Sequence, residues 1–296
     1  MTLLALDQLR IDDLEGQVLC EGWSVSTGRS AVALVGDFSP LSQLLLGRAE
    51  QVAGSAQIAG MPARQGVRDG SVGVASSELP LPPSWTVERY LQEAASMLGW
   101  SGRGAKDLAN NILQRLTLAH LCTRRFETLA AVDVRFVQLA AALLSSPQTL
   151  FLHEPFSDLD SASADAFDAR LALAAEGRNL LLTAKAIAAT GRERAALSRC
   201  DSVVLRTTAG LRAGGQELLD STAGVRLIVA RNAAALLEGL RARGLGAEAM
   251  SPTDEGRPSE LRVDAADAAQ LDALVAAAIE ADAPLLELVP LQGLDA

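Results

Sequence analysis

A histidine and a glutamate follow a short apolar stretch in the middle of the chain. His153 and Glu154 come directly after residues 149–152, which have the sequence TLFL. A carboxylate held at the end of a buried strand could act as a general base, and an imidazole could ligate a metal ion. His120 is the only other histidine, so no histidine-rich ligand set is available. We therefore expect no metal site, and a hydrogen-bonded histidine at position 153.

The elements that must position these residues alternate between short strands and helices. Apolar runs at residues 31–35, 149–152 and 180–183 indicate strands inside a covered, largely parallel sheet. Residues 86–98 and 134–144 have helical patterns, the first amphipathic and the second apolar on most sides. This alternation predicts an α/β fold.

A second pattern of elements begins after a glycine-containing break at residues 214–224. The order β-α-β-β-α-β is typical of a small ferredoxin-like α+β domain. We therefore expect one domain over residues 1–218 and another over residues 222–296. Its elements are expected at residues 225–230, 232–243, 247–250, 260–263, 264–281 and 285–289. Its core is expected to contain Leu236, Leu237, Leu240, Leu271, Leu274, Val275 and Ile279.

Composition excludes several classes of function. The 296 residues carry a net charge of −10, which argues against binding to nucleic acid or to anionic lipid. Cys20, Cys122 and Cys200 lie far apart without metal-ligand spacing, which fits a reducing compartment. No apolar run approaches the roughly 20 residues of a spanning helix, and the first residues lack a signal-peptide pattern. The chain is expected in the cytoplasm, with any membrane role through a partner.

The segment from Ser145 to Asp160 carries the strongest motif. Its sequence, SSPQTLFLHEPFSDLD, resembles the Walker B strand and D-loop of an ATP-binding-cassette (ABC) transporter ATPase, where a proline and four apolar residues precede D-E-P-T-S-G-L-D. The resemblance covers about residues 4–217. It implies an ABC-type, P-loop NTPase-like cassette with a mostly parallel sheet and a helical subdomain. The C-terminal unit resembles the domain appended to many ABC exporter subunits.

The phosphate loop of that family is degenerate in this sequence. A loop of the form G-x-x-x-x-G-K-[ST] holds phosphates through backbone N–H groups and a lysine. After the strand at residues 31–35 the chain has Gly36, Asp37, Phe38 and Ser39, with neither the second glycine nor the lysine. Asp37 places a negative charge where the phosphates would lie. We expect a plain strand-to-helix turn there.

Other positions that align with nucleotide-binding motifs have also changed. They are Ser77 for the Q-loop glutamine, Ala130 and Asp133 for the serine and glutamine of the signature, His153 for the Walker B aspartate, and Lys185 for the switch histidine. An imidazole is a poor substitute for an oxygen ligand of Mg²⁺. The resemblance therefore implies that no nucleotide, cofactor or metal binds at these positions.

Two interpretations remain for each motif that is retained. Glu154 aligns with the general base of the family, and it could act as a base or only cap the end of a buried strand. We favour the cap, because a base without a phosphate loop has no bound phosphate to act on. Lys185, which stands in place of the switch histidine, could pair with Glu154, Asp158 or Asp160. Ser157, Asp158 and Asp160 of the D-loop could contact a second cassette, or Asp160 could simply cap a helix.

These observations predict a pseudo-ATPase, which is a cassette that is not an enzyme and works by assembly. The resemblance implies two partners. One is an integral-membrane permease, whose coupling segment would enter a groove near Ser77, Leu81 and Trp85 and hold the chain at the inner membrane. The other is a second cassette, either a catalytic subunit or another copy of this chain. The alternatives are a divergent ATPase with weak activity in a heteromer, and a soluble scaffold or regulatory protein.

Overall fold

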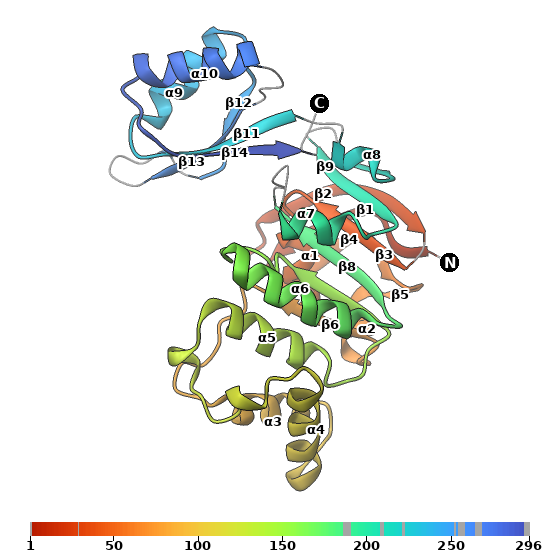
Figure 1. The fold of residues 1–296 in the computed structure, drawn as a ribbon. Coiled ribbons are helices and arrows are strands. Elements are labelled where there is room, and N and C mark those ends of the chain that lie inside the picture. The colour runs from red at the N-terminus through yellow and green to blue at the C-terminus, as the bar shows by residue number, and fades with distance from the viewer. Residues whose placement is uncertain are drawn as a thin grey trace. The chain divides into compact units, whose positions relative to one another are not determined.

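The computed structural model describes residues 2–28, 30–185, 191–207, 210–220, 223–251, 253, 258–263 and 268–292. The chain divides into two compact units (Figure 1). The large unit contains Met1–Lys185 and Gly191–Gln216, and the C-terminal unit contains Glu217–Ala296 together with Ala186–Thr190. Independent folding of the expected domains 1–218 and 222–296 remains a prediction.

A six-stranded sheet in the large unit positions the residues singled out by sequence. Its strand order is β10-β9-β3-β8-β7-β6, and all neighbouring strands are parallel except β10 with β9. The predicted α/β fold and its three apolar strands are confirmed. Strands that are covered on both faces are apolar along their length, which explains why the sequence revealed them. The strands are β3 (Ala31–Val35), β6 (Val72–Ser76), β7 (Thr149–His153), β8 (Asn179–Ala184), β9 (Ser202–Thr207) and β10 (Gly210–Gly214).

Two helices of the large unit, α3 and α6, begin at side-chain caps that the sequence provides. The Thr86 hydroxyl accepts from the Arg89 backbone N–H at the start of α3, and the Asp160 carboxylate accepts from the Ser163 N–H at the start of α6. The helices of this unit are α1 (Ser39–Leu45), α2 (Ala63–Arg68), α3 (Val87–Met97), α4 (Gly102–Arg115), α5 (Ala131–Ala142), α6 (Ser161–Ala175) and α7 (Arg192–Leu197). Two short 3₁₀ turns, Ala119–Leu121 and Phe126–Thr128, lie between α4 and α5.

A four-stranded antiparallel sheet also belongs to the large unit, and the sequence did not predict it. Its order is β2-β1-β4-β5. The strands are β1 (Thr2–Asp13), β2 (Val18–Gly28), β4 (Ala49–Ile58) and β5 (Met61–Pro62). Buried side chains of this sheet, of α1 and of the parallel sheet share one hydrophobic core, so the two sheets form a single packed body.

The C-terminal unit has the predicted ferredoxin-like order of elements. Its antiparallel sheet has the order β12-β13-β11-β14, and two helices follow β11 and β13 along the chain. The elements are β11 (Ala223–Val229), α9 (Ala233–Ala242), β12 (Ala247–Ala249), β13 (Ser259–Val263), α10 (Ala268–Glu280) and β14 (Leu285–Gln292), preceded by α8 (Glu217–Asp220). The predicted start of the last helix at residue 264 lies outside the described residues.

The core of the C-terminal unit corrects one part of the sequence interpretation. Leu236, Leu240 and Leu274 are fully buried, as expected. Val275 and Ile279, however, are 44% and 75% exposed, so their placement in the core was wrong. Each helical residue is rotated by about 100° from its predecessor, so Val275 points away when Leu274 faces the sheet.

A fragment of residues 222–296 is expected to fold alone, because the helices and strands of this unit enclose a core of their own. The expected result is cooperative thermal unfolding and dispersed amide resonances. Domains of this size are only marginally stable, so a low melting temperature is compatible with the prediction. A fragment that shows neither cooperative unfolding nor dispersed resonances would contradict it.

Among the described residues, no helix is both long enough and apolar enough to cross a membrane.

Candidate functional site

The residues predicted from sequence meet at the carboxyl ends of the parallel strands. Asp37 follows β3, Ser77 follows β6, Glu154 follows β7 and Lys185 follows β8, while His153 is the last residue of β7. In open α/β sheets, ligands bind outside this edge. The fold therefore brings together residues that lie far apart in the sequence, and we call these five residues the strand-end site.

Asp37 forms an ion pair with an arginine that sequence reasoning did not identify. Arg206 in β9 donates from Nη1 to the Asp37 carboxylate over 2.8 Å and to the Asp37 backbone carbonyl over 2.9 Å. The Asp37 carboxylate also accepts from the Ser39 backbone N–H at 3.0 Å. Burial favours the neutral acid, but the hydrogen bonds from Ser39 and the charge of Arg206 outweigh it and lower the pKa of Asp37. The turn from Gly36 to Ser39 is the predicted strand-to-helix turn, and it is closed by this ion pair.

His153 is completely buried at the end of β7. Its Nδ1 lies 2.9 Å from the Thr183 hydroxyl oxygen, which also accepts from the Glu154 backbone N–H. Burial lowers the pKa of His153, although the nearby carboxylate of Glu78 opposes this effect. The expected hydrogen-bonded histidine is therefore present.

The second ring nitrogen of His153 has a different environment. Nε2 lies 3.8 Å from a Glu78 oxygen and 3.9 Å from a Glu154 oxygen, beyond hydrogen-bond distance. Nε2 itself has no hydrogen-bond partner. In the described part of the chain, no three histidine, cysteine or acidic side chains are arranged to hold a metal ion.

Glu154 lies in an electrostatic environment that raises its pKa. Burial is the main cause, and the negative charges of Glu78, Asp37 and Asp158 add to it, while Lys185 acts in the opposite direction. Lys185 is exposed, and among the described residues no direct ion pair joins it to the carboxylates considered from sequence. A carboxylate with a raised pKa at a strand end can exchange a proton, and this is the chemistry that a general base needs.

A half-buried arginine links two of the predicted segments. Arg135 in α5 donates to the Ser77 carbonyl at 3.3 Å, to the Gln138 amide oxygen at 3.3 Å and to the Ser157 carbonyl at 3.4 Å. Burial lowers the pKa of Arg135, while the charges of Asp158 and Glu154 oppose that change. Arg135 thus holds the segment after β6 against the segment after β7.

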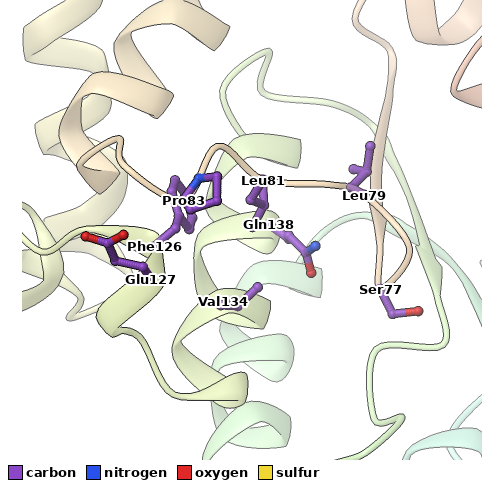
Figure 2. A pocket seen from close by; sticks show the side chains of 8 residues that line it. All are labelled: Ser77, Leu79, Leu81, Pro83, Phe126, Glu127, Val134 and Gln138. Atoms are coloured by element: carbon purple, nitrogen blue, oxygen red, sulfur yellow. The ribbon is translucent and has the colours of Figure 1, made fainter.

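An apolar pocket lies beside Ser77, with a volume of about 280 Å³ (Figure 2). One wall is the segment after β6, and the other includes a turn of α5. Its lining residues are Ser77, Leu79, Leu81, Pro83, Phe126, Glu127, Val134 and Gln138. Ser77 and Leu81 were predicted for this surface. Trp85 was also predicted, but it does not line the pocket, and its ring is covered by the Arg89 guanidinium at 4.3 Å.

The remaining predicted positions lie on loops and helix starts. Asp158 and Asp160 are exposed and Ser157 is half-buried. Asp160 caps α6, so the capping role considered from sequence is present. Ala130 is exposed immediately before α5, and Asp133 in the first turn of that helix lies 3.6 Å from Arg124.

Comparisons with solved structures identify the fold. CbiO1 from Clostridium perfringens, part of the ABC transporter complex CbiONQ, superposes with a TM-score of 0.57 over 72% of this chain and 88% of its own, at 18% identity. An ATP-binding cassette of an ABC transporter in its ADP conformation gives a TM-score of 0.57 over 73% of this chain and 92% of its own, at 16% identity. The fold is that of the ATP-binding cassette.

Sequence relatives of this chain are ATP-binding proteins. The Nod factor export ATP-binding protein I of Burkholderia orbicola is 30% identical over 144 residues, which are 48% of this chain and 47% of that protein. The protein of the same name from Rhizobium sp. strain N33 is 30% identical over 148 residues, or 49% of each chain. The chain thus spans about half the length of the curated relatives it matches. A putative ABC transporter ATP-binding protein of Brucella suis is 43% identical over 63 residues, which are 21% of this chain and 26% of that protein. No protein-family model matches this chain.

These comparisons correct the prediction that the cassette is not an enzyme. The relatives are ATP-binding proteins, and one of them is a putative ABC transporter ATP-binding protein. A solved neighbour is an ATP-binding cassette of an ABC transporter, and such cassettes form a class of ATPases. Degenerate motifs alone were therefore insufficient to place the chain outside that class.

Proposed function

We propose that this chain is the cassette subunit of an ABC transporter complex, docked on an integral-membrane permease through the pocket beside Ser77 and Leu81. The observation that supports this most directly is the apolar pocket, which lies where the family resemblance places the permease-facing groove. Such docking would hold the chain at the cytoplasmic face of the inner membrane.

The chemistry of the pocket suits a protruding apolar side chain of a partner. Leu79, Leu81 and Val134 are only partly buried in the isolated chain, so a partner side chain would remove their apolar surface from water. A volume of about 280 Å³ is large enough for one bulky side chain. Apolar anchors in pockets supply much of the energy of protein interfaces, and this favours a short helical or loop segment as the occupant.

We further propose that the cassette pairs with a second cassette through the segment containing Ser157, Asp158 and Asp160. The two aspartates are exposed, so they are available to a partner. Arg135 fixes the backbone of this segment at the Ser157 carbonyl. The second cassette is either another copy of this chain or a catalytic subunit.

The proposal is tested by purifying the tagged chain from detergent-solubilised native membranes and identifying its partners by mass spectrometry. Recovery of a polytopic membrane protein at a fixed ratio to the chain is the expected result. Recovery of soluble proteins alone would instead support the scaffold or regulatory interpretation.

A second candidate function is ATP hydrolysis by this cassette within a heteromer. The observation that favours it is Glu154, a carboxylate with a raised pKa at the end of β7 in a fold of the ATPase class. Asp37 in the turn after β3 is paired with Arg206 of β9. The nucleotide phosphates would therefore have to be held by other groups, including those of the second cassette.

Under this second function, Glu154→Gln is expected to lower the ATPase rate of the purified complex by roughly 100-fold, the usual contribution of a general base. Glutamine has nearly the same shape but cannot accept a proton, so assembly should be unchanged. Asp165→Asn on α6 is the control, because Asp165 is exposed and lies outside the strand-end site. An unchanged rate in a correctly assembled Glu154→Gln complex would contradict this role.

A further inference from the structure

One wall of the apolar pocket contains a buried polar group that lacks a partner. Gln138 in α5 lines the pocket and is only 3% exposed. Its amide receives a hydrogen bond from Arg135 Nη1 at 3.3 Å, and because arginine only donates, the atom that faces it is the amide oxygen. Within the described part of the chain, the amide nitrogen Nε2 has no hydrogen-bond partner. The acceptor of this amide is therefore paired, while its N–H donors are not.

Arg135, one turn before Gln138 on α5, carries a charge that is only partly compensated. Its three hydrogen bonds go to neutral carbonyl and amide oxygens, and its buried Nε has no partner among the described residues. No ion pair joins it to a carboxylate of those residues, and Asp158 and Glu154 attract it only from a greater distance. The guanidinium therefore polarises the Gln138 amide that it contacts and strengthens the amide as a donor.

The polar and acidic groups of the pocket lie on different sides of it. Figure 2 shows the Gln138 amide extending from α5 toward Ser77, whereas the Glu127 carboxylate lies on the opposite side. Leu81 and Val134 lie between these two groups in the same view. An occupant that places an apolar side chain beside Leu81 therefore brings its neighbouring residues to the Gln138 amide and keeps them away from Glu127.

We propose that Gln138 Nε2 binds the carboxylate of an acidic side chain of the permease segment that docks in this pocket. The inference rests on the proposed docking and adds the chemistry of the occupant, which is an apolar residue with an aspartate or glutamate about one helical turn away. A carboxylate is favoured over a neutral carbonyl, because a hydrogen bond to a charged acceptor is about twice as strong and Arg135 adds its attraction.

Entry of the occupant requires the amide nitrogen to become accessible. Nε2 is covered in the isolated chain. Residues 77–83, which supply lining residues on the facing wall, form neither helix nor strand. We expect a small movement of that segment to accompany docking, with the hydrogen bond to Nε2 offsetting its cost.

The test is copurification of the tagged full-length chain with the permease from solubilised membranes. Gln138→Glu keeps an acceptor for Arg135 but replaces the donors with a second carboxylate, so recovery of the permease should fall by roughly 100-fold or more. Gln138→Met removes the donors without adding a charge, and recovery should fall by about 10-fold. Gln114→Glu is the matched control, because Gln114 in α4 is exposed and lies outside the pocket. Its recovery should equal that of the wild type.

The stability of the chain without its partner separates recognition from folding. Gln138→Glu supplies Arg135 with a counter-ion, so its melting temperature should equal or exceed that of the wild type. A lower melting temperature together with normal recovery would mean that Gln138 is a structural residue, and would overturn the proposal. Equal losses of recovery for Gln138→Met and Gln138→Glu would indicate a neutral acceptor and would also overturn it.

Failure of this inference is distinguishable from failure of the docking proposal. Normal recovery of both Gln138 variants, with loss of recovery for Leu81→Asp, overturns the inference alone. Absence of a polytopic membrane protein with the wild-type chain overturns the docking itself. If Gln138→Glu does not fold, the partner segment crosslinked by a photoreactive amino acid at position 81 decides. An aspartate or glutamate within about one helical turn of the crosslinked residue supports the proposal, and a segment without one contradicts it.

Discussion

Replacing Leu81 with aspartate is expected to abolish copurification of the chain with the proposed permease partner. Leu81 lines the apolar pocket together with Leu79 and Val134, and a partner side chain in that pocket would exclude water from it. An unpaired carboxylate buried in such a contact costs about 3–5 kcal/mol, which corresponds to a loss of affinity of roughly 100-fold or more. The measurement is the amount of permease recovered with the tagged variant from solubilised membranes.

A matched substitution separates loss of docking from loss of folding. Leu173 in α6 is 53% exposed and lies outside the pocket, so Leu173→Asp introduces the same charge elsewhere on the cassette. This control should copurify with the permease like the wild type, and both variants should unfold at nearly the wild-type temperature. Normal copurification of Leu81→Asp would mean that the pocket is not the docking surface.

Replacing Gly73 with alanine is expected to destabilise the cassette by about 3 kcal/mol. Gly73 lies in β6, where α5 crosses closely. A Cβ at position 73 would be 2.2 Å from the Ala142 carbonyl oxygen and 2.8 Å from Pro147. Since the first contact is with backbone, the helix itself must move away from the sheet. The pocket between the segment after β6 and α5 should then be distorted as well.

The measurement is urea unfolding of the full chain, in which Gly73→Ala should lower the midpoint and leave the slope nearly unchanged. Gly28→Ala is the control, because a Cβ there would meet nothing within 4 Å. That control should change the free energy of unfolding by less than about 0.5 kcal/mol, as is usual for an uncrowded surface position. Equal stabilities for the two variants would show that α5 can yield to the added methyl group at little cost.

The parallel sheet could be predicted from sequence because its strands are covered on both faces. Residues 31–35, 149–152 and 180–183 are continuous apolar runs, and they form β3, β7 and β8. The strands of the antiparallel sheet are harder to recognise from the sequence. In β1 the pairing register shifts several times, and Gln8 has a φ of +45°, so the alternation of buried and exposed residues is interrupted. A bulge of this kind moves later side chains to the other face and removes the two-residue period.

The strand-end site could be predicted only in part. The positions of Asp37, His153 and Glu154 follow from the ends of recognisable strands. Arg206 was missed because it lies 169 residues from Asp37, within a strand whose sequence shows nothing unusual. The family resemblance predicts which positions depart from the nucleotide-binding motifs, whereas the contacts that Asp37 and His153 make depend on tertiary packing.

Arg135 was missed for a related reason. It lies in a helix that the sequence marks as apolar on most sides, and a single arginine in such a helix is equally compatible with a solvent-facing position. Its three acceptors are carbonyl or amide oxygens rather than carboxylates, so no charge pattern in the sequence points to it. The prediction that the chain is not an enzyme was wrong for another reason. It rested on altered motif residues alone, and such changes do not remove a chain from a fold whose members are ATPases.

Site-specific photocrosslinking in intact cells tests most directly whether a permease segment occupies the pocket beside Leu81. A photoreactive amino acid placed at position 81 should crosslink to one polytopic membrane protein, identified by mass spectrometry. The same amino acid at position 173 should not crosslink to that protein. Crosslinking of position 81 only to soluble proteins, or to nothing while the chain is folded and expressed at normal levels, would mean that no permease segment occupies this pocket.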